Sequence, residues 1–208
     1  MASALLGLAL SVLTLANAAA PVRGVPPIGI TVTAVADVPP KLLSMILDEA
    51  DAIWRPTGIR FVWQHAPASI PTMLHVTIDH ARRPPIDADV PLGWVVFNDG
   101  RSPEPEIHLS YASALEYLQA SRLVVGNVER MPLLERYTLL SRALGRALAH
   151  ELGHYLLASK SHAPRGLMQT HRSASDLFGM SRAGFTISAE ERSVVAARLG
   201  PPIVVGSR

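Results

Sequence analysis

The chain has 208 residues, of which 49% are hydrophobic and 17% charged. This composition supplies enough apolar surface for a packed core and excludes a disordered chain. The formal net charge is only +2, and Arg82 and Arg83 form its only adjacent basic pair, so no nucleic-acid partner is expected. The absence of cysteine excludes disulfides, cysteine hydrolases and cysteine-ligated structural zinc sites.

The first residues have the pattern of a secretory signal peptide. An uncharged apolar run from Ala4 to Ala16 is followed by small residues, and two overlapping triplets match an A-x-A cleavage site. We therefore predict a signal peptide over 1–20, cleaved after Ala18 or Ala20, and a single domain over 21–208. The expected location is secreted or periplasmic, with no stable membrane association after cleavage. The alternatives are a retained anchor or a core helix, although the run is short for a membrane span.

The first half of the mature chain is predicted to contain strands and one helix. Residues Ile30–Ala36 alternate β-branched side chains, which is typical of a strand. Apolar residues then recur at helical spacing until Pro56 and Gly58 stop the run. Four further strands are expected at Ile59–Gln64, Leu74–Asp79, Leu92–Phe97 and Ile107–Tyr111.

The second half is predicted to be helical. A short helix is expected from Tyr111, and a long amphipathic helix from Pro132 to about Leu157. Near the end, Ser188 and Glu191 have the spacing of a capping box that begins a terminal helix. This order of elements predicts an α+β fold, in which a mixed sheet of about five strands lies beside a long helix and a C-terminal helix.

The long helix carries the sequence HELGH, which has the spacing of a zinc site. His150 and His154 are four residues apart, so both imidazoles lie on one helix face and can reach one ion. Glu151 lies next to that face, where its carboxylate can take a proton from a zinc-activated water without being a ligand. We therefore predict one catalytic Zn²⁺, with His150 and His154 as ligands and Glu151 as the catalytic base.

A catalytic zinc site needs a third protein ligand. His162 is the first candidate, because it follows His154 by eight residues, past the expected end of the helix, where the chain can turn back toward the metal. His171 is the next candidate. Glu190 or Glu191, from the terminal helix, is a further alternative, although the capping box already gives Glu191 a structural role.

The stretch from His150 to Met168 resembles the metzincin zinc metallopeptidases, whose pattern is HExxHxxGxxH followed by a methionine turn. The resemblance implies that His150 and His154 are the first two ligands and that Glu151 is the general base. It also implies that the turn Gly166-Leu167-Met168 places a methionine beneath the site. A sheet before the zinc helix and a single closing helix are similar to the matrixin-like branch. The resemblance further implies a cleft under an edge strand, for which Leu92–Phe97 is the candidate, with a peptide substrate bound along it.

The chain departs from the metzincin pattern after the second histidine. The position of the family's glycine is occupied by Leu157, and that of its third histidine by Lys160. The histidine that is present, His162, comes two residues later, giving the variant HExxHxxxxxxxH. Leucine does not easily take the left-handed conformation that glycine allows. Either the helix runs slightly longer before the chain turns back, or His162 is not the ligand.

The leading hypothesis is an exported zinc metalloendopeptidase that hydrolyses peptide bonds in peptide or protein substrates. Two other hypotheses are kept. One is a non-catalytic exported binding domain that retains a metallopeptidase scaffold, and the presence of Glu151 argues against it. In the other, HELGH is a structural part of an amphipathic helix and binds no metal.

Overall fold

The structure is a computed structural model that describes residues 25–64, 71–83, 90–98, 100 and 102–200. The predicted signal peptide over 1–20 lies outside these residues, so both it and the limits of the mature domain stay predictions. Within the described residues, no helix combines the length and the apolar character that crossing a membrane requires.

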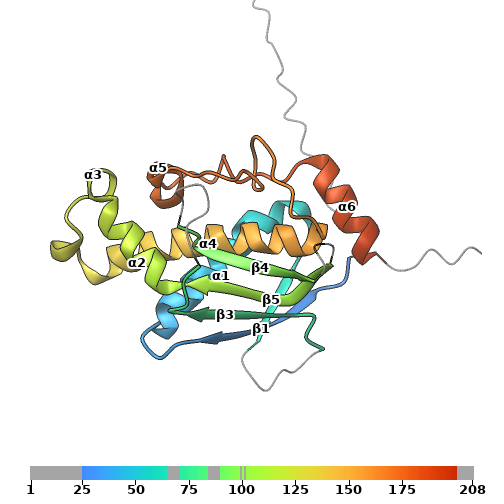
Figure 1. Cartoon of the computed structure of the whole chain (residues 1–208), viewed down its shortest axis with the longest axis horizontal. Coiled ribbons are helices and arrows are strands. Elements are labelled where there is room, and N and C mark those ends of the chain that lie inside the picture. Colours follow the sequence, from blue (N-terminus) through green and yellow to red (C-terminus); the bar gives the residue numbers. More distant parts are fainter. Residues whose placement is uncertain (1–24, 65–70, 84–89, 99, 101, 201–208) are drawn as a thin grey trace, which may run out of the picture.

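Five strands form one mixed sheet in the order β2-β1-β3-β5-β4 (Figure 1). Strands β2, β1, β3 and β5 run parallel, and β4 is antiparallel to β5 at the edge. The strands are β1 (Ile28–Ala34), β2 (Phe61–Gln64), β3 (Leu74–Asp79), β4 (Gly93–Asn98) and β5 (Ser102–Ser110). The sheet and its helices confirm the α+β class, and the predicted strand Leu92–Phe97 is confirmed as an edge strand to within one residue.

Strand β5 begins five residues earlier than predicted. The sequence NDGRSPEPE was predicted to be a turn and loop from its turn signals. Within it, Pro103 and Pro105 lack the N–H that a central strand donates. In the structure, this first part of β5 pairs with β4 alone, and pairing with β3 starts only at Glu106. Both prolines therefore lie where one side of the strand has no neighbour, next to an irregularity in the β4 register. Tyr111 begins a helix instead of ending the strand.

The helices α1 and α4 lie against each other, and α4 also contacts β4 and β5 (Figure 1). Strand residues that point toward these helices, such as Ile30, Val76 and Ile107, are fully buried. The alternate residues on the other face include Thr33, which hydrogen-bonds to His75. The helices are α1 (Pro40–Trp54), η1 (Arg55–Thr57), α2 (Tyr111–Ala120), α3 (Arg122–Val125), η2 (Val128–Arg130), α4 (Leu133–Leu157), α5 (Ala174–Phe178) and α6 (Ala189–Leu199).

A glycine allows α1 and α4 to approach closely. A Cβ at Gly145 would stand 2.7 Å from the backbone oxygen of Ile46 and 2.5 Å from the Cβ of Glu49. Near this crossing, the indole N–H of Trp54 donates to the backbone oxygen of Ala149 at 3.1 Å. The close approach fixes α4 against the core and so positions the part of the helix that carries HELGH.

The predicted limits of the last two long helices agree with the structure. Pro132 is the N-cap of α4, and the helix ends at Leu157. The capping box predicted from Ser188 and Glu191 is present at the start of α6. The short α3, η2 and α5 were not predicted, because elements of three to five residues are too brief to show a periodic pattern.

Candidate metal centre

Three histidines converge at the C-terminal part of α4. The Nε2 atom of His154 lies 3.0 Å from Nε2 of His150 and 3.2 Å from Nε2 of His162. One ring nitrogen from each of the three lies within 4.8 Å of the others, as a shared metal ion requires. His162 therefore completes the cluster, and neither His171 nor Glu190 belongs to it. Glu191 is engaged in the capping box of α6.

The end of α4 explains how His162 reaches the other two histidines. The residue after the helix, Ala158, takes the left-handed conformation with φ 49° and ψ 44°. The N–H of Ser159 then donates to the backbone oxygen of His154 at 3.2 Å, which closes the helix end. The left-handed residue is therefore Ala158 and not Leu157. This conformation costs a non-glycine residue roughly 1–2 kcal/mol. Of the two alternatives that the sequence left open, the structure shows the first, because the helix continues through Leu157 before the chain turns back.

Backbone carbonyls orient two of the imidazoles. The Nδ1 atom of His150 lies 2.9 Å from the backbone oxygen of Leu167, and Nδ1 of His154 lies 2.7 Å from that of Ser159. A carbonyl can only accept, so each Nδ1 carries the hydrogen and each neutral ring leaves its Nε2 lone pair unprotonated. Both lone pairs therefore belong to the nitrogens that converge. This second layer of hydrogen bonds is usual around zinc-binding histidines.

The surroundings keep the three imidazoles neutral. Burial, followed by the neighbouring His154, lowers the pKa of His150 to about 3. Burial is also the largest cause of the lowered pKa values of His154 and His162. A metal ion binds the deprotonated form of histidine. Three neutral nitrogen donors, two of them with rings oriented by backbone carbonyls, thus fit a Zn²⁺ ion, for which the site offers three protein ligands.

Glu151 lies beside the histidines and against the edge strand. Its side chain is only 8% exposed, and the N–H of Val95 donates to its carboxylate. Burial raises the pKa of this carboxyl to about 8. The Cγ of Glu151 would lie 3.1 Å from a Cβ at Gly93, so β4 passes close to the acid. Glu151 is therefore held at the wall of the cleft, next to the three imidazoles and outside their cluster.

A cleft of about 550 Å³ opens in front of these residues. The three histidines and Glu151 form one wall, and the residues of β4 from Gly93 to Phe97 form another. Because β4 lies at the edge of the sheet, its outer side pairs with no strand among those described. An extended peptide can add to such an edge through backbone hydrogen bonds.

The turn after the third histidine packs a methionine against the helix. The N–H of Gln169 donates to the backbone oxygen of Gly166 at 3.3 Å, and Leu167 N–H donates to the oxygen of Thr186 at 2.7 Å. Met168, which is 3% exposed, places its sulfur where a Cβ at Gly153 would lie. The absence of a side chain at Gly153 thus leaves the space that the methionine sulfur fills.

Four cationic side chains that the sequence analysis did not single out for a site also line the cleft. They are Arg83, Arg146, Lys160 and Arg172. Arg146 precedes His150 by four residues, which puts both on one helix face. This spacing was the available signal for Arg146. Nothing local in the sequence indicates that the others approach the same cleft.

Comparison with solved structures finds chains similar to this one, among them an archaemetzincin. No family model and no curated protein matches the chain. Archaemetzincin from Methanopyrus kandleri aligns with 83% of this chain and 95% of its own, at 14% identity and a TM-score of 0.49. At this level of similarity, the function has to be inferred from the site itself.

Proposed function

We propose that the protein is a zinc-dependent peptidase that hydrolyses internal peptide bonds. The observation that carries the proposal is the convergence of His150, His154 and His162. In this proposal, the three imidazoles hold one Zn²⁺ through their Nε2 atoms. The buried carboxyl of Glu151 stands beside them at the edge strand, where a catalytic base is needed.

The residues around the histidines have separate tasks. A bound Zn²⁺ supplies a Lewis acid and lowers the pKa of water toward neutrality. The positive charge of a bound Zn²⁺ would favour the ionised form of Glu151, whose pKa burial raises. In that form, a Glu151 carboxylate oxygen accepts the proton of the attacking water and then delivers it to the nitrogen of the leaving amine. The backbone of β4 aligns the peptide, because its outer side has unpaired groups to which an extended chain can bond. The N–H of Val95 holds the Glu151 carboxylate in place.

We also propose that the protein acts outside the cytoplasm, in secreted or periplasmic form, on peptides or proteins. The support is the apolar N-terminal run with its A-x-A triplets, which has the pattern of a signal peptide. Mass spectrometry of the exported protein tests this point directly. A mature N-terminus at residue 19 or 21 is expected, and an uncleaved cell-associated chain would contradict it.

The activity is tested with a mixed peptide library and two proteins, the wild type and Glu151→Ala. Zinc content is measured in both by atomic emission after dialysis. The expected result is one zinc per chain in each protein and cleavage by the wild type alone, with a loss of at least about 100-fold in the variant, in line with removal of a general base. Equal cleavage by both proteins would reject the mechanism. Zinc binding without any cleavage would favour a non-catalytic binding domain.

A further inference from the structure

The charge of the cleft is strongly one-sided. Among the described residues that line it, Arg83, Arg146, Lys160 and Arg172 are cationic, and Glu151 is the only carboxylate. Lys160 lies near one end of β4, with its ammonium 5.2 Å from the centre of the Phe97 ring. Arg83 stacks over Trp94 at 5.4 Å, near the other end. A groove lined by one sign of charge attracts ligands of the opposite sign.

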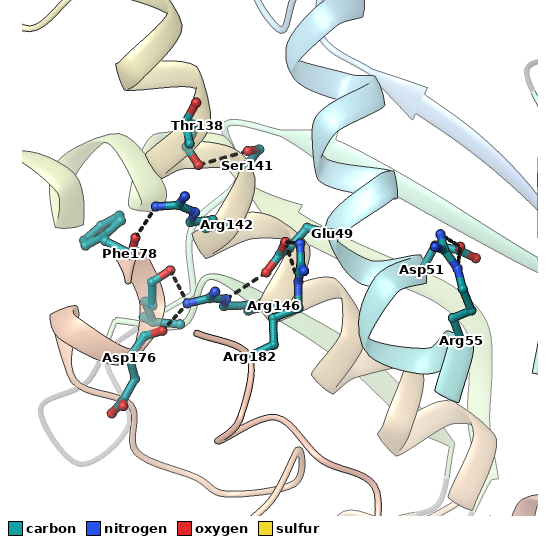
Figure 2. A network of polar contacts seen from close by, with 11 residues as sticks. Glu49, Asp51, Arg55, Thr138, Ser141, Arg142, Arg146, Asp176, Phe178 and Arg182 are labelled. Atoms are coloured by element: carbon teal, nitrogen blue, oxygen red, sulfur yellow. Dashed lines mark hydrogen bonds and ion pairs between the residues drawn. The ribbon is translucent and has the colours of Figure 1, made fainter. Parts of the chain in front are cut away.

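Arg146 is the most buried of these cations. It is 1% exposed and precedes His150 by one helical turn, about 6 Å along the axis. Its Nε donates to Glu49 at 3.0 Å, and its Nη1 donates to the backbone oxygens of Asp176 and Leu177 (Figure 2). Its Nη2 has no hydrogen-bond partner within the described part of the chain. The guanidinium is thus held firmly while one of its nitrogens is left without an acceptor.

Arg172 reaches the same recess from the segment that follows Met168. Its Nη2 donates to the backbone oxygen of Gly166. The Arg172 and Arg146 guanidinium carbons lie 4.3 and 4.8 Å from the centre of the Phe185 ring. Both cations therefore pack against the same aromatic ring. Burial is the main cause of the lowered pKa of Arg172, and the charge of Arg146 lowers it further. Arginine nevertheless stays protonated in proteins, so both side chains carry charge.

Among the described residues, the nearby carboxylates do not balance this charge. Glu49 accepts from Arg146 and also from Arg182, whose Nε and Nη2 lie 2.9 and 2.5 Å from its second oxygen (Figure 2). One carboxylate is therefore shared by two guanidiniums. The Asp176 carboxylate accepts from the backbone and the hydroxyl of Ser173. It is exposed and is engaged in capping α5, although its charge also acts on Arg172.

We propose that this recess, formed by Arg146, Arg172 and Phe185, binds a carboxylate of the substrate and makes acidic peptides the preferred substrate class. The inference rests on the proposed peptidase function and adds its specificity. Arg172 makes the direct contact, because it is less buried than Arg146 and, among the described residues, its guanidinium hydrogen-bonds through Nη2 to the Gly166 oxygen, which leaves its other donors for a ligand. Arg146 lies behind it and adds positive charge. The carboxylate can belong to an Asp or Glu side chain near the cleaved bond, or to the C-terminus of a short peptide.

Physical chemistry favours a carboxylate over a neutral group here. A planar guanidinium matches a carboxylate with two parallel hydrogen bonds, which are stronger than bonds between neutral groups. A neutral apolar side chain would cover Arg172 and Arg146 without giving their N–H groups an acceptor, and leaving buried donors unpaired is costly. Ala147, which also lines the cleft, is small and leaves room between the histidines and the recess.

Binding tests the inference independently of catalysis. Fluorescent peptides are titrated against full-length, zinc-loaded Glu151→Ala protein, so that nothing is cleaved. One series moves a single Glu through a neutral amidated peptide, and the matched series carries Gln. A third pair compares a free C-terminal carboxylate with its amide. We expect the acid to bind about 10- to 100-fold more tightly than its neutral partner in at least one arm. The arm that discriminates identifies the source of the carboxylate.

Variants then assign the preference to a residue. In the Glu151→Ala background, Arg172→Gln should abolish the discrimination and Arg172→Lys should retain part of it. Arg60→Gln is the matched control, because Arg60 is exposed beside β2, at the sheet edge opposite β4, and should leave the discrimination unchanged. If Arg172→Gln does not fold, as judged by circular dichroism, the Arg172→Lys result and the loss of discrimination in rising salt decide the question.

The possible outcomes separate this inference from the proposed function. Equal binding of acid and neutral peptides, absence of any peptide binding, or discrimination that persists in Arg172→Gln would overturn the carboxylate site. Acid-selective binding by a wild type that cleaves no peptide would support the site and reject the peptidase. Cleavage without acid preference, mapped by mass spectrometry of library products, would support the peptidase and reject the site.

Discussion

The sulfur of Met168 occupies the space that a side chain at Gly153 would need. Gly153 is the fourth residue of HELGH, between Glu151 and His154, and Met168 comes from the turn that follows His162. The backbone oxygen of Leu167, one residue earlier, accepts from His150. The turn therefore both packs against the metal helix and orients one of its imidazoles. We therefore expect a substitution at the contact between Gly153 and Met168 to affect the metal centre.

We expect Gly153→Ala to destabilise the protein and to weaken zinc binding. Alanine normally favours a helix, but here its Cβ would displace Met168, and overpacking costs typically about 1–3 kcal/mol. Urea denaturation and zinc competition with a chromogenic chelator measure the two effects. The double variant Gly153→Ala/Met168→Ala should lose less stability than the sum of the single changes, because the clash is gone. Additive losses would show that the contact is not the cause.

The crossing of α1 and α4 gives a second test, at a position away from the histidines. Replacing Gly by Ala inside a helix usually stabilises it by about 1 kcal/mol. We expect Gly145→Ala to have the opposite effect and to lower the free energy of unfolding by about 1–3 kcal/mol. The reason is that the new Cβ would meet the backbone oxygen of Ile46 at 2.7 Å. A backbone atom cannot move aside as a flexible side chain can. Unchanged or raised stability in urea denaturation would refute the close packing.

Removal of zinc and of the third ligand should have linked effects. We expect a chelator to lower the melting temperature, because a ligand bound only to the folded state stabilises it by about 4 kcal/mol at a thousand times its Kd. His162→Ala should bind zinc at least about 100-fold more weakly, since it removes one of three ligands. His171→Ala is the matched control, and it should keep zinc because His171 lies outside the cluster. If equilibrium dialysis instead shows that His171→Ala loses zinc and His162→Ala keeps it, the third ligand is His171.

The end of α4 offers a change that should stabilise the protein. Ala158 has a φ of 49°, which costs a non-glycine residue roughly 1–2 kcal/mol. Ala158→Gly removes this strain, but glycine also makes the unfolded chain more flexible, which offsets part of the gain. The net result should be a free energy of unfolding higher by up to about 1 kcal/mol. Ala197→Gly, at an exposed position within α6, should instead cost about 1 kcal/mol. Thermal denaturation compares the two, and equal losses would argue against a left-handed residue at the helix end.

Short-range patterns in the sequence predicted much of the fold. The strand Leu74–Asp79 was predicted to the residue, and α4 differs from its prediction only in Pro132, which caps the helix instead of starting it. These elements have strong periodicity and clear ends. The start of β5 was missed because Pro103 and Pro105 oppose a central strand. Whether a proline is tolerated depends on which neighbours its strand has, and that depends on residues far away in the chain.

The sequence alone determined which donors could meet at a metal. His150 and His154 share a helix face through their spacing, and His162 follows closely enough to turn back. The tertiary structure decided how that group is completed. It brought the third imidazole to the other two through a left-handed Ala158, buried the Glu151 carboxyl against β4, and gathered Arg146 and Arg172 around Phe185. Helical spacing is a local property of the chain, whereas burial and charge pairing depend on contacts between residues distant in sequence.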